Sequence, residues 1–267
     1  MINFSELLWK PQAKGISSSP SRSQSFEVTE LSHDLRQTPV DEVQIKPTSR
    51  LVVLTDPRSS GADRFRYLRM RLNELRDVAR LRSLVITSPL PQDGKSTVVL
   101  NLATILAEGG KRSVLVIEAD LHHPTLAQRL GVRSQAGLSE CLEGSLDPMM
   151  AIRRVDPPHC YLLQAGTPKG NPTELLQSGN LATVLESLSS HFDWVLIDTP
   201  PVTPLTDAVS ISRLVDASLL VVRADYTPKG AVEEALSILG AKNVAGIVFN
   251  AAEQLISSYY GYYNKAK

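Results

Sequence analysis

The segment from Ser88 to Thr97, Ser-Pro-Leu-Pro-Gln-Asp-Gly-Lys-Ser-Thr, brings a lysine, a glycine and several hydroxyl groups together directly after an apolar run. A helix is expected to begin near Lys95, because apolar residues follow it at helical spacing. The free N–H groups and the positive dipole end of a helix N-terminus favour phosphate. Lys95 would reach the β- and γ-phosphates of a nucleotide, and the Ser96 hydroxyl would hold Mg²⁺. The segment therefore predicts a phosphate-binding loop.

The match to the general loop pattern is incomplete. Pro89 stands five residues before Gly94, where the pattern has a glycine. A surface turn that happens to contain Gly-Lys-Ser is the alternative, although the strand before the loop and the helix after it favour the phosphate site. The expected nucleotide-binding residues are Gln92, Asp93, Gly94, Lys95, Ser96 and Thr97.

Acidic residues stand at the ends of two further apolar runs. Glu118 and Asp120 follow one run, and Asp198 follows another within Asp-Thr-Pro-Pro. In a doubly wound sheet, ligands bind beyond the carboxyl ends of the strands, so these carboxylates would share a crevice with Lys95. They would hold Mg²⁺, directly or through water, and position an attacking hydroxyl. A helix cap or turn residue is the alternative for any one of them, but three acids in this order favour a site.

Composition limits the class of protein. The chain has 267 residues, 42% of them apolar, which is compatible with one sizeable core. The 28 basic and 28 acidic residues balance, so nucleic acid is not expected as a main partner. The two cysteines form neither a metal-ligand cluster nor a disulfide framework. No apolar run is long enough to span a bilayer, and residues 1–10 lack the core of a signal peptide, which together predict a cytoplasmic protein.

Short apolar runs alternate with helical segments over most of the chain, a pattern typical of a parallel sheet covered by helices on both faces. We therefore expect an α/β fold with a doubly wound, mostly parallel sheet. The expected strands are 84–87, 113–117, 161–164, 194–197, 219–222 and 246–249. A helix with an arginine-rich outer face is expected over residues 61–80.

Three regions are expected along the chain. Residues 1–50, which are rich in serine near their middle, predict a flexible arm. Residues 51–250 would form the P-loop domain, and residues 251–267 a tail that holds four of the seven tyrosines. So dense a tyrosine cluster is hard to explain by packing, so it suggests a substrate for the nucleotide site.

Several motifs together resemble the bacterial tyrosine kinases of polysaccharide synthesis, a family with a P-loop ATPase fold of the MinD and ParA type. The resemblance covers about residues 60–267. The matching segments are residues 94–97 (Walker A core), 118–124 (the family's second Walker segment, here Glu-Ala-Asp-Leu-His-His-Pro), 170–176, 198–201 (Walker B) and the tyrosine-rich tail. Asp63, Arg66 and Arg69 resemble the family's Glu-x-x-Arg-x-x-Arg interface helix.

The resemblance implies an ATP-dependent protein-tyrosine autokinase that phosphorylates its own tail in trans, and so regulates the polymerisation and export of exopolysaccharide or capsule. ATP and Mg²⁺ would be the cofactors. The implied catalytic residues are Lys95, Glu118, Asp120 and Asp198, with Glu118 orienting or deprotonating the tyrosine. The implied metal ligands are Ser96, Asp120 and Asp198, and the implied phosphoacceptors are Tyr259, Tyr260, Tyr262 and Tyr263.

The resemblance also implies partners. The chain would form a ring-like homo-oligomer through Asp63, Arg66 and Arg69. A separate membrane-embedded chain-length regulator, or polysaccharide co-polymerase, would recruit it to the inner face of the membrane. A cognate phosphatase would restore the tail.

The chain departs from the family pattern at four positions. Gln92 replaces a glycine, Glu118 replaces an aspartate, and His122 and His123 replace arginines.

Two other functions remain open. An organising ATPase of the MinD or ParA type would carry a lysine where this chain has Leu90. A non-catalytic nucleotide-binding scaffold of the same pathway is the second.

Overall fold

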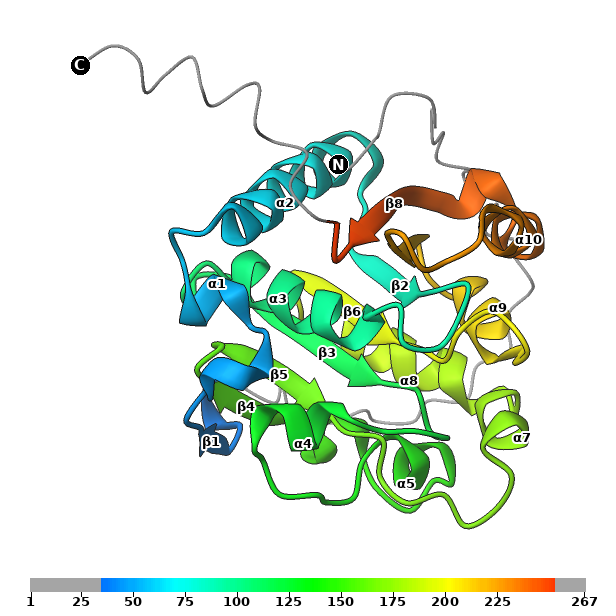
Figure 1. Cartoon of the computed structure of the whole chain (residues 1–267). Coiled ribbons are helices and arrows are strands. Elements are labelled where there is room, and N and C mark those ends of the chain that lie inside the picture. The colour runs from blue at the N-terminus through cyan, green and yellow to red at the C-terminus, as the bar shows by residue number, and fades with distance from the viewer. Residues whose placement is uncertain (1–34, 253–267) are drawn as a thin grey trace, which may run out of the picture.

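The computed structural model describes residues 35–252, which form one sheet with helices on both of its faces (Figure 1). The strands are β1 (Val40–Glu42), β2 (Ser83–Thr87), β3 (Val114–Glu118), β4 (Arg153–Asp156), β5 (Cys160–Leu163), β6 (Trp194–Asp198), β7 (Ala217–Arg223) and β8 (Val244–Asn250). Their order in the sheet is β1-β4-β5-β3-β6-β2-β7-β8. All neighbouring pairs are parallel except β4 and β5. The predicted doubly wound, mostly parallel fold is confirmed.

Helices cover the sheet because its strands are apolar on both sides. The helices are α1 (Val52–Thr55), α2 (Ser60–Ala79), α3 (Lys95–Ala107), α4 (Leu126–Leu130), α5 (Leu138–Leu142), α6 (Pro148–Ala151), α7 (Pro172–Leu176), α8 (Asn180–Ser189), α9 (Asp207–Ser212) and α10 (Lys229–Leu239). Short 3₁₀ turns are η1 (Leu35–Gln37), η2 (Pro47–Ser49) and η3 (Ala241–Asn243). Along β2, Leu84 and Ile86 join the core formed with α2 and α3, whereas Val85 joins the core formed with α5 and α8.

The six expected strands are present, and the structure adds β1 and β4 at one edge of the sheet. The sequence did not indicate these two strands, because charged residues interrupt them and their burial is only partial. An ion pair of 2.6 Å between Arg153 and Asp41 joins them. Residues 35–50, which the sequence placed in a flexible arm, are therefore part of the domain. Residues 1–34 lie outside the described part of the chain.

Helix α2 matches the helix expected over 61–80. The Ser59 side chain caps its N-terminus by accepting a hydrogen bond from the Ala62 N–H, and Leu68 and Leu72 are fully buried in the core that α2 shares with α3. Within residues 35–252, no helix is long and apolar enough to cross a membrane.

Both cysteines are buried and unpaired, Cys141 in α5 and Cys160 in β5. Burial raises the pKa of each thiol to about 12. Among residues 35–252, the structure contains no group of three or more His, Cys, Asp or Glu side chains that could hold a metal ion.

Candidate functional site

The loop between β2 and α3 has the geometry expected of a phosphate site. Strand β2 ends at Thr87, and α3 begins at Lys95 after a loop in which Gly94 has a φ of 93°. A Cβ atom at position 94 would lie 2.1 Å from the Asn250 side-chain nitrogen, so Asn250 would have to move, and the positive φ itself favours glycine. Because a helix leaves its first N–H groups without intrahelical partners, those of α3 are available to a phosphate placed at the loop.

Gln92 occupies the left-handed region with a φ of 66°. The family has glycine at this position, and a non-glycine residue there costs about 1 kcal/mol. The glutamine lies at the mouth of the loop, where its side chain is exposed. The chain therefore adopts the loop conformation at the expense of some backbone strain.

The carboxylates predicted from three strand ends do lie at one edge of the sheet. Strand β6 lies between β3 and β2, and Glu118 and Asp198 are directly paired across β3 and β6. Lys95 Nζ lies 3.2 Å from Asp120 Oδ2, and both side chains are largely buried. The structure thus brings together the lysine and the acids that the sequence predicted.

Asp198 has the most perturbed environment of these acids. Burial raises the pKa of its carboxyl to about 7, although Lys95 and a hydrogen bond with Ser96 act in the opposite direction. Its Oδ1 is buried and has no hydrogen-bond partner. An orphaned carboxylate oxygen beside a serine hydroxyl fits Mg²⁺, which typically takes one or two carboxylates together with nucleotide phosphates.

The two oxygens of Glu118 are occupied by backbone groups. Oε1 accepts hydrogen bonds of 2.6 Å from the N–H groups of both Thr125 and Leu126, and Oε2 accepts one of 3.3 Å from Ala165. Burial nevertheless raises the pKa of the carboxyl above its usual value. Glu118 therefore fastens β3 to the start of α4 and to the segment after β5, and neither oxygen is directed freely at a substrate.

His122 pairs with an acid that the sequence did not single out. Its Nε2 lies 3.1 Å from Oδ2 of Asp207, which is fully buried at the start of α9, and 3.3 Å from the Thr173 hydroxyl of α7. An imidazole here links three segments, whereas the family's arginine would add a permanent charge. No sequence signal identified Asp207, because its burial depends on packing between distant helices. His123 is exposed, and its N–H donates to Asp120 Oδ1.

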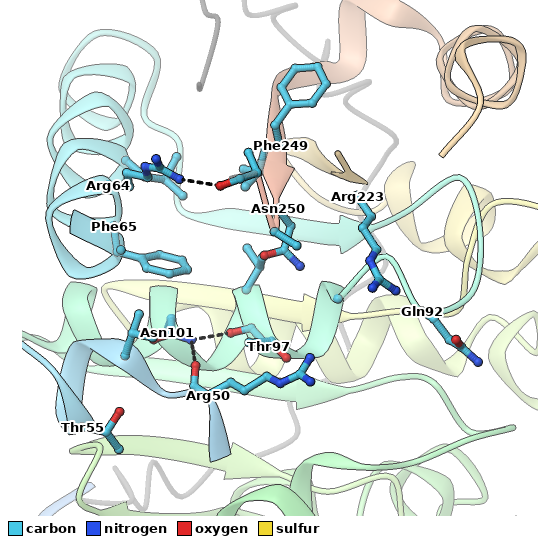
Figure 2. A pocket seen from close by; sticks show the side chains of 18 of the residues that line it. Arg50, Thr55, Arg64, Phe65, Gln92, Thr97, Asn101, Arg223, Phe249 and Asn250 are labelled. Atoms are coloured by element: carbon cyan, nitrogen blue, oxygen red, sulfur yellow. Dashed lines mark hydrogen bonds between the residues drawn. The ribbon is translucent and has the colours of Figure 1, made fainter. Parts of the chain in front are cut away.

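An apolar cavity of about 490 Å³ adjoins the other side of the loop (Figure 2). Arg64 and Phe65 of α2 lie on one side of it and Asn250 of β8 on the other, and Arg64 donates a hydrogen bond to the Ala252 carbonyl. The cavity is large enough for a nucleoside, and its apolar lining suits the flat face of a base.

A second cleft, of about 660 Å³, shares the loop residues and is strongly basic. Four basic side chains line it: Lys46, Arg50, Arg129 and Arg223. In the part of the chain that the structure describes, no acidic side chain lines the cleft, and none of these four forms an ion pair. Arg129 Nη1 donates to the Thr97 hydroxyl, which ties the cleft to the first turn of α3. Sequence reasoning missed these four residues, since they come from three segments of the chain that are far apart in sequence.

Of the predicted interface residues on α2, Asp63 is exposed, whereas Arg66 and Arg69 are partly buried. Asp63 and Arg66 pair with one another at 2.8 Å, and Arg66 also donates to the Pro57 carbonyl. Arg69 reaches the Ile105 carbonyl of α3 at 3.4 Å. The four predicted phosphoacceptor tyrosines lie outside the described residues.

The phosphate-binding loop lies between β2 and α3, and acids lie at or just after the ends of the neighbouring strands β6 and β3. This arrangement defines a nucleotide-binding domain of the P-loop NTPase class, in its MinD and ParA-like form. No protein-family model matches the chain. The chain is 31% identical over 216 residues to the tyrosine-protein kinase YwqD of Bacillus subtilis (strain 168), and the match covers 80% of this chain and 90% of YwqD. The chain belongs to the bacterial tyrosine-protein kinases. This membership decides against an organising ATPase.

Two further similarities extend this result. The kinase domain of the Escherichia coli tyrosine kinase ETK has a TM-score of 0.71 and 29% identity, over 78% of this chain and 83% of that domain. The succinoglycan biosynthesis transport protein ExoP of Rhizobium meliloti (strain 1021) is 31% identical over 219 residues. That match covers 80% of this chain but 28% of ExoP, so the chain spans under a third of that relative.

Proposed function

We propose that the chain transfers the γ-phosphate of ATP to the tyrosine cluster in the tail of another copy, at Tyr259, Tyr260, Tyr262 and Tyr263. The observation that carries this proposal is the buried Lys95–Asp120 pair beside Asp198, where adjacent strands end at the loop. Phosphoryl transfer depends on positioning and charge, and a largely buried lysine next to two buried acids supplies both.

Each side chain has a distinct role in the proposed reaction. Ser96 and Asp198 would hold Mg²⁺, which would supply positive charge to offset that of the ATP phosphates. Lys95 moves from Asp120 to the phosphates of ATP. Asp120 Oδ2 is then free to accept a proton, whereas Glu118 keeps its backbone hydrogen bonds.

The chemical step balances without a further reactant. The tyrosine oxygen forms a bond to the γ-phosphorus, and the bond between that phosphorus and the β,γ-bridging oxygen breaks. ADP leaves with the bonding electrons, and the phenol proton passes to Asp120. The products are ADP and a phosphotyrosine, which adds about −1.5 to −2 charges at neutral pH.

A mixing experiment tests the transfer between copies. A Lys95→Met chain keeps its tail but lacks the phosphate-binding lysine, and a chain with all four tail tyrosines changed to Phe keeps its site but lacks acceptors. Neither variant alone should gain tail phosphotyrosine with MgATP, whereas their mixture should gain it on the Lys95→Met tail. A mixture without tail phosphotyrosine, beside an active wild type, would contradict transfer between copies.

We further propose that the chain assembles through α2 and acts in polysaccharide export. The motif at Asp63, Arg66 and Arg69 and the name of the relative ExoP support this. A separate membrane-embedded co-polymerase would hold the chain at the inner face of the membrane, and a phosphatase would reset the tail. Changing Arg66 and Arg69 together to Ala should lower the mass measured by light scattering. An unchanged mass would remove α2 from the interface.

A further inference from the structure

The loop residue Asp93 is fully buried, and its contacts lie away from the acids that perform the chemistry. Its Oδ2 accepts a hydrogen bond of 3.0 Å from the Leu90 N–H, within the loop itself. Its Oδ1 accepts one of 2.6 Å from the Thr227 hydroxyl, just beyond β7. Its carbonyl accepts one of 2.8 Å from the side-chain amide of Asn250, at the end of β8. Residues at or just beyond the ends of the neighbouring strands β7 and β8 thus hold a single loop residue by hydrogen bonds.

The three hydrogen bonds to Asp93 hold the part of the loop whose backbone is strained. Gln92 and Gly94, on either side of Asp93, both have positive φ values, of 66° and 93°. A glutamine with this backbone conformation persists only where surrounding contacts enforce it. Asn250 also fills the space that a side chain at position 94 would need.

Thr227 connects Asp93 to Arg223, a residue that lines both cavities. Its hydroxyl oxygen accepts a hydrogen bond of 3.1 Å from the Arg223 N–H while the hydroxyl donates to Asp93. Arg223 lines both the apolar cavity and the basic cleft, and its guanidinium lies over the Tyr226 ring at 4.8 Å. One hydroxyl group therefore links the strained loop to the arginine beside it.

We propose that Thr227 and Asn250 are positioning residues for nucleotide binding, which hold Asp93 so that the strained loop keeps its phosphate-binding shape before the nucleotide arrives. The inference rests on the proposed function, since it assumes that the loop binds ATP and ADP. Pre-organisation of this kind raises affinity by removing the cost of ordering the loop on binding.

The test uses the full chain with Thr227→Val, which removes the hydroxyl at nearly constant volume, and Thr227→Ser, which keeps it. Calorimetric titration with MgADP should give a Kd about three- to tenfold higher for the valine variant, the loss expected for one hydrogen bond, and a near-normal Kd for the serine variant. In a Gln92→Gly background the same loss should be smaller, because glycine adopts the positive φ without support.

A matched control separates positioning from simple stability. Asn243 donates a side-chain hydrogen bond of 3.0 Å to the Leu239 carbonyl, at the end of α10, and does not line either cavity. Asn243→Ala should lower the melting temperature of the nucleotide-free protein and leave the Kd for MgADP unchanged. Thr227→Ala repeats the test with a smaller side chain, so the result does not depend on how valine packs.

The outcomes are distinct. If Thr227→Val and Thr227→Ala lower the melting temperature but bind MgADP as the wild type does, the positioning role is wrong. An equal loss in the wild-type and Gln92→Gly backgrounds would overturn the link to loop strain. If the wild type itself binds no MgADP, the proposed nucleotide function fails, and that result is recognisable without any variant.

Discussion

The two sides of the phosphate-binding loop differ in the sign of the charges that line them and in how deeply these charges are buried. On one side, Asp120 and Asp198 are buried, and a single lysine accompanies them. On the other side, Arg50, Arg129 and Arg223 line an open cleft with no acid among its described lining residues. The acidic side suits a metal ion and a reacting hydroxyl, whereas the basic side suits the negative charge of a bound nucleotide. We therefore expect the acidic side to govern turnover and the basic side to govern affinity.

The largest effect should come from Lys95→Met. The substitution removes the charge that would reach the phosphates and leaves Asp120 without its partner, so the rate of tail phosphorylation should fall roughly 100-fold or more. Initial rates at saturating ATP provide the measurement, with Lys111→Met as the control because Lys111 is exposed and distant in sequence from the loop. A rate within a few-fold of the wild type would end the assignment of turnover to the acidic side.

Asp198→Asn should remove a pH dependence of stability. The pKa of Asp198 is raised by burial to about 7 from 3.8, so the folded state holds its proton more tightly than the unfolded state. The carboxyl's contribution to stability is therefore complete below about pH 3.8 and is lost as pH rises from there through about 7. Without nucleotide and Mg²⁺, the melting temperature of the asparagine variant should gain on that of the wild type by several degrees between pH 5 and pH 8. A difference that stays constant between these pH values would contradict the buried charge.

Arg129→Gln should affect the basic side alone. The guanidinium donates to the Thr97 hydroxyl and would reach a phosphate placed on the first turn of α3. We expect the KM for ATP to rise about three- to tenfold with little change in kcat, and the salt dependence of binding to weaken. Arg154→Gln is the control, since Arg154 pairs with Asp156 far from the loop. A fall in kcat at unchanged KM would break the division between the two sides.

The smallest effect should come from Gln92→Gly. The strain of about 1 kcal/mol at the positive φ is present with and without nucleotide, so its removal should change MgADP binding by a few-fold at most, through the greater mobility of the free loop. Calorimetry detects a change of this size, with Gln128→Gly in α4 as the control for the loss of a cleft glutamine. Binding weakened by more than a few-fold in the Gln92→Gly variant would mean that the glutamine side chain itself contacts the nucleotide.

The central sheet and the acidic side were predictable because each depends on local pattern. Apolar runs predicted the positions of six of the eight strands, and the residues that follow parallel strands must meet at one edge. The order of the motifs along the chain was therefore enough to place Lys95, Asp120 and Asp198 together correctly. The position of Glu118 was also predicted, but its hydrogen bonds to the start of α4 were not, because they depend on where the chain returns.

The basic side was not predictable, because it depends on residues that only the folded chain brings together. Arg50, Arg129 and Arg223 are separated by 79 and 94 residues, and each alone resembles an ordinary solvated arginine. The grip of Thr227 on Asp93 likewise joins residues 134 positions apart. Strand β1 was missed because a three-residue edge strand with two acids has no apolar period to detect.

The state of the two cysteines has a practical consequence. A thiol with a pKa of about 12 is almost entirely protonated at neutral pH, and a buried thiol meets reagents slowly, so Cys141 and Cys160 should resist maleimides and mild oxidants. The chain contains no other cysteine. A single cysteine introduced at the exposed Tyr226, beside the basic cleft, would then be the one reactive thiol and could carry a fluorophore. Because the native cysteines would not react, the binding of a nucleotide at the loop can be followed by fluorescence from this one labelled position.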